Sequence, residues 1–200
     1  MLPDDLVDGL FKCGCFLVGE FRLSSGKISP YYIDLRKVPS NPKLFDSVTD
    51  IYVSTIRGLG NFDRIAGIAT AGLPIATLVA YKLGKPLVYV RRERKEHGTI
   101  GEVEGGLRPG ERVVVVDDVA TTGESIKLAV QAIRDRGGVV DHSVVLIDRG
   151  QGAGSLLAGI GVKLVAATTA RSLLEQLRLK GLMSEEEYER VVRYMEGEHV

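Results

Sequence analysis

The sequence has few of the residues and segments that mark several classes of protein. Among its 200 residues there are two cysteines and no tryptophan. No apolar run approaches the roughly 20 residues that a membrane-spanning helix needs. Lys plus Arg and Asp plus Glu both number 26, so the formal net charge is zero. No global field therefore draws the protein to nucleic acid or to a membrane surface, and any binding of anions must be local.

Targeting and metal-binding signals are also missing from the N-terminal segment. The sequence MLPDDLVDGLFK opens with two acids, where a secretory signal would have basic residues. Cys13 and Cys15 lie two residues apart, with no second pair to complete a tetrahedral zinc site. We therefore expect a cytoplasmic protein with two free, partly buried thiols.

The remaining composition is that of an ordinary globular protein. Hydrophobic residues make up 44% and charged residues 26%. A chain of this length favours one domain over two, so we predict a single domain over residues 1–200. Mixed polar and apolar residues at 16–36 predict strands and turns, as part of a small N-terminal cap over about residues 1–40. Ser184 and Glu187 match a capping box, which predicts a C-terminal surface helix over 184–196.

Strand-like and helix-like segments alternate along the chain. Apolar runs rich in β-branched residues predict strands, and two segments have the spacing of an amphipathic helix. Strands buried on both faces and alternating with helices are typical of a parallel sheet. We therefore predict an α/β fold with a central parallel sheet flanked by helices. The predicted strands cover 65–69, 86–90, 112–116, 143–147 and 162–167, and the predicted helices cover 42–58 and 123–136.

One strand is followed by an unusual combination of residues, in RVVVVDDVATTGES at 112–125. A turn of small residues that enters a helix offers N–H groups and the positive end of the helix dipole to a phosphate, and Thr121 and Thr122 add hydroxyl donors. Asp117 and Asp118 would repel that phosphate, so they must face sugar hydroxyls or a cation. A ribose 5-phosphate satisfies both demands. The alternative is a strand followed by an acidic N-capping turn.

Three further loops are informative because ligands bind beyond the carboxyl ends of strands in open parallel sheets. The segment RRERKEHGTIGEVEGG at 91–106 combines basic residues with glycines, which suits a moving loop or an ordinary solvated one. Ala71 and Gly72 leave the backbone open to a ligand, or serve tight helix packing. Arg149 follows another strand, where a guanidinium can grip a planar carboxylate or pair with groups around Asp148.

Together these segments resemble a known family. VVVVDDVATTGES resembles the phosphoribosyl pyrophosphate (PRPP) motif of the type I phosphoribosyltransferases. FRLSSGKISPYYIDLR and VRRERKEHGTIGEVEG resemble segments of the orotate phosphoribosyltransferase family, and the matching motifs sample about residues 20 to 150. The resemblance implies a type I phosphoribosyltransferase fold with an N-terminal hood. It implies Mg²⁺-dependent transfer of phosphoribosyl from PRPP to N1 of orotate, giving orotidine 5'-monophosphate and pyrophosphate in UMP biosynthesis.

The resemblance also implies roles for particular residues, with Mg²⁺ as cofactor and no side chain assigned as its ligand. The residues implied in catalysis are Lys95, His97, Arg91, Asp117 and Asp118. The residues implied to bind orotate are Lys27, Thr121 and Arg149. The residues implied to bind PRPP are Arg91, Arg92, Lys95, His97, Ala71, Gly72, Asp117, Asp118, Val119, Ala120, Thr121, Thr122, Gly123, Glu124 and Ser125. Arg92 and Ala71 stand where some relatives have lysine, and Ala71 removes one expected cation.

For partners, the resemblance implies a homodimer in which the loop at 91–106 reaches the neighbouring active site. Neither nucleic acid nor a membrane is expected as a partner. One rival is a purine phosphoribosyltransferase, which would share the PRPP motif but is disfavoured by the orotate-like N-terminal segment. Another is a PRPP-sensing transcription regulator, which is disfavoured by the zero net charge and by the lack of an evident helix-turn-helix extension.

Overall fold

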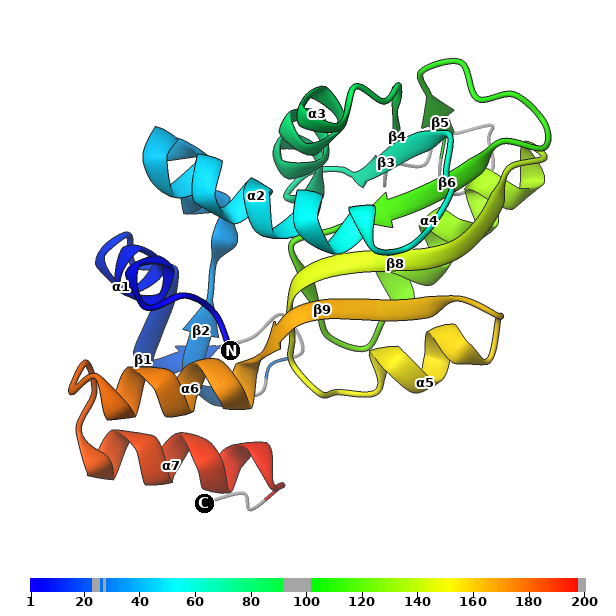
Figure 1. Cartoon of the computed structure of the whole chain (residues 1–200). Helices are drawn as coiled ribbons and strands as arrows, with labels where there is room; N and C mark the ends of the chain where they lie inside the picture. Colours follow the sequence, from blue (N-terminus) through cyan, green and yellow to red (C-terminus); the bar gives the residue numbers. More distant parts are fainter. Residues whose placement is uncertain (23–25, 27, 92–101, 198–200) are drawn as a thin grey trace. The chain divides into compact units, whose positions relative to one another are not determined.

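The structure is a computed structural model that describes residues 1–22, 26, 28–91 and 102–197. The chain divides into two compact units (Figure 1). One consists of Met1–Phe45 with Ala170–Val200, and the other of Asp46–Thr169. The prediction of one domain with a cap over about residues 1–40 stays a prediction.

The unit at 46–169 contains the sheet that the sequence predicts. Its strands run in the order β5-β4-β3-β6-β8, with β7 and β9 also paired to β8. All described pairs are parallel except that of β4 with β5, so the sheet has one antiparallel edge strand that the prediction missed. The strands are β3 (Arg64–Ile68), β4 (Leu87–Arg91), β5 (Glu102–Glu104), β6 (Arg112–Val116), β7 (Val119–Ala120), β8 (Val139–Asp148) and β9 (Lys163–Thr169).

Helices flank this sheet because their apolar stripes need a partner surface (Figure 1). The predicted helix at 123–136 is α4 (Glu124–Asp135), and its apolar stripe, which includes Ile126 and Ile133, is buried. The predicted helix at 42–58 is α2 (Pro42–Arg57), which buries Val48, Tyr52 and Ile56. Two more helices follow β3 and β8, namely α3 (Gly72–Leu83) and α5 (Ala153–Ala158).

One apolar core lies between the strands and the helices α4 and α5. It joins alternate residues of the central strands, such as Val115 and Val145, to Val130 of α4 and Leu157 of α5, all of them almost fully buried. Burial of each such aliphatic side chain contributes about 1.5–3 kcal/mol to folding. This core holds the strand ends at fixed positions, and the loops that follow them therefore begin from a rigid frame.

The other unit is built from the two ends of the chain. Strands β1 and β2 pair antiparallel, which confirms the predicted strands within 16–36. Gln176 of α6 joins the chain ends, since its side chain bonds both the N–H and the carbonyl of Leu2, at 3.1 and 2.8 Å. The elements are α1 (Asp4–Lys12), β1 (Phe16–Arg22), β2 (Ile28–Ile33), a 3₁₀ helix η1 (Leu35–Ser40), α6 (Ala170–Leu179) and α7 (Glu185–Met195).

Two smaller predictions about this unit are confirmed. Ser184 caps α7 by accepting from Glu187 N–H at 3.2 Å, while Glu187 Oε2 accepts from Ser184 N–H at 2.8 Å. Cys13 and Cys15 are both free, the first half-buried and the second buried. Burial raises the pKa of the Cys15 thiol to about 12.

Among the helices that the structure describes, none has the length and apolarity to cross a membrane.

Candidate active site

The carboxyl ends of β3, β6 and β8 meet at one edge of the sheet. Gly67 of β3 pairs with Val116 of β6, and Val116 pairs with Val144 of β8. Since the three strands are parallel, the loops that leave them open on the same side. These loops contain Ala71 and Gly72, the turn at 117–125, and Arg149. The structure therefore places these three predicted segments along one edge.

Asp117 and Asp118 begin the turn after β6, and both carboxylates are held by the local backbone. Asp117 is 5% exposed, and its Oδ1 accepts from the N–H of Asp118 at 3.0 Å. Asp118 is half-buried, and its Oδ1 accepts from the N–H of Val119 at 2.8 Å. Each carboxylate thus bonds to the backbone of the residue that follows it and stabilises the turn at that point. The backbone of the turn in return fixes the orientation of both side chains.

Gly72, the first residue of α3, lies against Asp117. A Cβ at this position would be 2.7 Å from Asp117 Oδ1 and 2.8 Å from the carbonyl oxygen of Val116. Because Gly72 has no side chain, helix α3 can pack closely against the end of β6. Tight helix packing, which the sequence left open as an alternative, explains Gly72. The contact of Ala71 and Gly72 with PRPP stays a prediction.

The turn ends at the N-terminus of α4. Gly123 is the N-cap residue with φ +87°, a backbone conformation that residues with a Cβ rarely adopt, and a Cβ there would lie 3.0 Å from Cα of Ala153. Among the described residues no side chain caps this helix. Thr121 and Thr122 are exposed immediately before it. Exposed hydroxyls beside the positive end of a helix dipole suit an anion such as a phosphate.

Strand β7, which lies inside the turn, attaches it to the end of β8. Val119 pairs with Ile147 and Ala120 with Asp148, and the N–H of Arg149 donates to the carbonyl of Ala120 at 2.9 Å. Arg149 itself is half-buried. The structure therefore brings Arg149 next to the segment at 117–125, as the sequence requires if both belong to one site.

Arg91 lies at the same edge of the sheet, as the last residue of β4. Its Nη1 is 3.7 Å from Oε1 of Glu104, and both side chains are about 40% exposed. An exposed ion pair of this kind contributes at most about 1 kcal/mol. The other predicted residues of the basic loop, Arg92, Lys95 and His97, lie outside the described residues, and so does Lys27.

Tyr52 of α2 contacts the turn, although no motif of the sequence points to it. It is 1% exposed, and its hydroxyl donates to the carbonyl oxygen of Asp117 at 2.9 Å. A signal was present, because a buried tyrosine among aliphatic residues needs a partner for its hydroxyl. The pattern of the helix could not say which partner, since Asp117 is 65 residues away.

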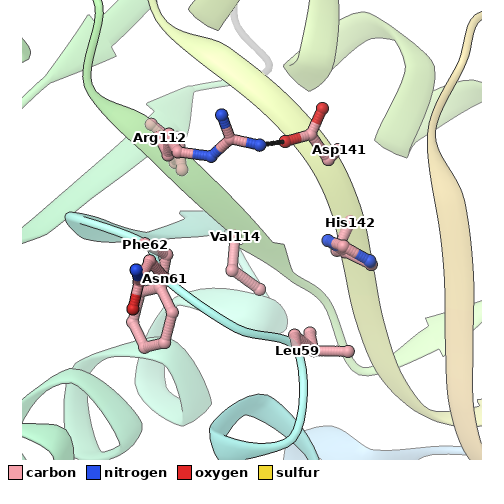
Figure 2. A pocket seen from close by; sticks show the side chains of 8 residues that line it. Leu59, Asn61, Phe62, Arg112, Val114, Asp141 and His142 are labelled. Atoms are coloured by element: carbon pink, nitrogen blue, oxygen red, sulfur yellow. Dashed lines mark hydrogen bonds and ion pairs between the residues drawn. The ribbon is translucent and has the colours of Figure 1, made fainter.

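Two hollows of the described surface lie far from these strand ends. Figure 2 shows the smaller, beside Arg112, the first residue of β6, where Arg112 pairs with Asp141. Its volume of about 10 Å³ has room for about one water molecule. The larger, of about 450 Å³, is an open hollow beside Asp141 and Lys163, where β9 begins. Both lie toward the amino ends of the parallel strands and contain none of the predicted site residues.

Within the described parts of the chain, no three His, Cys, Asp or Glu side chains gather into a metal site. The two neighbouring carboxylates of Asp117 and Asp118 are nevertheless the ligand type that Mg²⁺ prefers. This ion is commonly bound by one or two carboxylates together with substrate phosphates. The donor set of the turn thus fits a magnesium ion that a phosphorylated substrate brings with it.

Comparisons with known proteins agree with this geometry. A family model, the phosphoribosyl transferase domain, matches residues 36–160, which include the turn at 117–125 and Arg149. The chain is 42% identical over 191 residues to the orotate phosphoribosyltransferase of Sulfolobus acidocaldarius, with 96% of each chain covered.

Two solved structures are similar as well. The crystal structure of orotate phosphoribosyltransferase from Aeropyrum pernix matches with a TM-score of 0.81 and 44% identity, over 90% of this chain and 99% of that one. The structure of Leishmania donovani UMP synthase matches with a TM-score of 0.87 and 34% identity, over 97% of this chain and 42% of that one.

Proposed function

We propose that this chain, which belongs to the orotate phosphoribosyltransferase family, transfers the phosphoribosyl group of PRPP to N1 of orotate. The products are orotidine 5'-monophosphate and pyrophosphate, a step of UMP biosynthesis. The observation that supports this most strongly is the turn at 117–125. It joins two carboxylates to an open helix N-terminus, and its strand β7 is bonded to the segment that contains Arg149.

The turn divides the binding of PRPP between its two halves. Asp117 and Asp118 face the ribose hydroxyls, which donate hydrogen bonds to carboxylates. Thr121, Thr122 and the backbone N–H groups from Thr121 through Ser125 hold the 5'-phosphate, where the dipole of α4 favours negative charge. One short segment thereby offers hydrogen-bond acceptors to the sugar and hydrogen-bond donors to its phosphate.

Orotate is oriented from a neighbouring position. Arg149 follows β8 beside the turn, and its planar guanidinium can bind the orotate carboxylate with two parallel hydrogen bonds. Lys27 and Thr121 contact the base in this proposal. N1 of orotate is then held near the anomeric carbon, as a displacement at that carbon requires.

The reaction breaks the bond between the anomeric carbon and a pyrophosphate oxygen, forms the bond from that carbon to N1, and releases the proton of N1 to the departing pyrophosphate. Negative charge develops on the departing pyrophosphate, which needs positive groups around it. Arg91, Arg92, Lys95 and His97 supply them, with the backbone at Ala71 and Gly72 beside the pyrophosphate.

We propose that the protein is a cytoplasmic homodimer, in which the loop at 91–106 of one subunit serves the active site of the other.

Magnesium completes the proposal. Asp117 and Asp118 are the residues that would face it, together with oxygens of PRPP. When bound, Mg²⁺ would neutralise charge on the pyrophosphate oxygens. The carboxylates themselves orient the ribose hydroxyls, whatever the metal contributes.

The test is the consumption of orotate, followed by its ultraviolet absorbance, in purified protein given PRPP and Mg²⁺. A parallel sample receives a chelator. We expect loss of orotate that requires both PRPP and metal. Orotate that stays untouched while adenine, guanine or hypoxanthine reacts would overturn the assignment of the base. A monomeric mass with full activity would overturn the shared loop.

A further inference from the structure

The hydrogen-bond ladder between β6 and β8 is interrupted at Asp117 and Asp118. The N–H of Asp117 donates to the carbonyl of Val144 at 3.2 Å. In a regular parallel ladder the carbonyl of Asp117 would then accept from the N–H of Leu146. Instead the N–H of Leu146 donates to the carbonyl of Asp118 at 3.1 Å. Pairing with β8 then resumes at Val119, the first residue of β7. At this break the carbonyl of Asp117 takes a donor from outside the ladder.

The hydroxyl of Tyr52 is that donor. It reaches the carbonyl oxygen of Asp117 at 2.9 Å from helix α2, and the tyrosine is 1% exposed. Burial, with the negative charges of Asp118 and Asp117 nearby, raises the pKa of Tyr52 well above its ordinary value. The hydroxyl therefore stays protonated and able to donate.

Asp117 is held at both its side chain and its backbone. Helix α3 approaches the carboxylate so closely that only glycine fits at position 72, and helix α2 binds the carbonyl through Tyr52. A break in a ladder leaves backbone polar groups that must find other partners when they are buried. The contact with Tyr52 satisfies one of them at the point where the two acids leave the strand.

We propose that Tyr52 is a positioning residue for the PRPP-binding turn. Its hydroxyl fixes the break at Asp117 and Asp118, and so fixes the direction in which the two carboxylates meet the ribose hydroxyls. This inference rests on the proposed binding of PRPP at the turn. Tyr52 itself touches no substrate and takes no part in proton transfer.

The test is to compare Tyr52→Phe with Thr49→Val. Thr49 is also fully buried on α2, but its hydroxyl donates at 2.9 Å to Asp46 within the same helix. Each change therefore deletes one buried hydroxyl of one helix, and only the first removes a bond to the turn. PRPP binding is measured calorimetrically without orotate, at a temperature where circular dichroism shows both variants folded.

We expect Tyr52→Phe to raise the Kd for PRPP about tenfold, as loss of one hydrogen bond predicts, and Thr49→Val to change it less than twofold. The KM for orotate at saturating PRPP should change less than twofold in both. Equal Kd values for the two variants would overturn the positioning role. A wild type that binds PRPP but leaves orotate untouched would refute the transfer reaction without touching this inference.

Hydrogen exchange gives a second measurement, which needs no variant. In the wild type, PRPP should slow exchange of the Asp118, Val119 and Leu146 amides, because binding stabilises the break. In Tyr52→Phe without ligand, the same amides should exchange faster than in Thr49→Val. Unchanged exchange in the wild type on addition of PRPP would contradict the coupling of the break to the ligand.

Discussion

In the unit at 46–169, two ion pairs at the amino edge of the sheet and the two acids after β6 at its carboxyl edge are held in different ways. At the amino edge, Arg64 Nη2 binds Glu111 Oε1 at 3.0 Å, and Arg112 pairs with Asp141. The first pair joins the start of β3 to the residue before β6, and the second joins β6 to β8. At the carboxyl edge, Oδ1 of Asp117 and of Asp118 accepts from the next backbone N–H.

The difference lies in what fixes each charged side chain. A pair between side chains of two strands fixes the strands and neutralises both groups. Carboxylates that are bonded to their own turn take their position from the backbone, and we propose that those of Asp117 and Asp118 face a ligand. The comparison therefore predicts that equivalent substitutions at the two edges differ in their effects on activity and stability. Each variant below is paired with a control variant elsewhere in the chain.

The largest effect is expected for Lys95→Ala, in the basic loop after β4. If Lys95 stabilises the leaving pyrophosphate or transfers a proton, turnover of orotate should fall about a hundredfold or more. Lys163→Ala, at the amino-edge hollow, is the counterpart and should keep full turnover. Steady-state kinetics of both folded variants decides the matter, and unchanged turnover in Lys95→Ala would remove this lysine from the mechanism.

A smaller effect is expected for Asp118→Asn. The loss of charge-assisted hydrogen bonds to ribose should lower kcat/KM for PRPP about thirtyfold, which corresponds to about 2 kcal/mol. Asp141→Asn removes the carboxylate that pairs with Arg112 and should leave kcat/KM within about twofold, since exposed pairs contribute little. If the two variants lost activity equally, the two edges would not differ in function.

Gly72→Ala should act on stability and on activity together. The added methyl group would meet Asp117 Oδ1 at 2.7 Å, so α3 or the end of β6 must shift, at about 1–3 kcal/mol of unfolding free energy. Gly154 of α5 has no atom within 4 Å of an added Cβ, and Gly154→Ala should stabilise by up to about 1 kcal/mol. Urea unfolding measures both changes. A fully stable, fully active Gly72→Ala would show that the contact is not constrained.

The smallest effect concerns the dependence of stability on pH at the amino edge. The bond from Arg64 holds the pKa of Glu111 below its ordinary value of 4.5. A lowered pKa in the folded state gives stability that is present above the unfolded pKa and is lost as the pH falls through the folded one. The stability difference between wild type and Glu111→Gln should therefore shrink below about pH 4.5. Urea unfolding at neutral and acid pH tests this, with the exposed Glu189→Gln as control.

Much of the fold could be predicted from the sequence because local patterns determine it. Buried runs such as RVVVV and the spacing of α4 identify elements whose ends the structure moves by few residues. The antiparallel edge strand β5 was missed because it is three residues long and has no pattern of its own. Its assignment depends on pairing with β4, which no local window contains.

The site shows the same division between local and distant information. The motif at 117–125 predicts its own chemistry, since the acids, the hydroxyls and the helix start are consecutive. The contacts that fix the motif come from elsewhere: Tyr52 from α2 and Gly72 from α3. The spacing of residues in the sequence does not indicate that the hydroxyl of Tyr52 bonds to the carbonyl of Asp117. This contact is visible only in the structure.

The most direct test of the central claim is a crystal structure of this chain with PRPP and Mg²⁺. The account predicts the 5'-phosphate at the N-terminus of α4, within hydrogen-bond distance of the Thr121 hydroxyl, and the ribose hydroxyls against Asp117 and Asp118. A phosphate found instead in the hollow beside Lys163, with the turn at 117–125 empty, would contradict it.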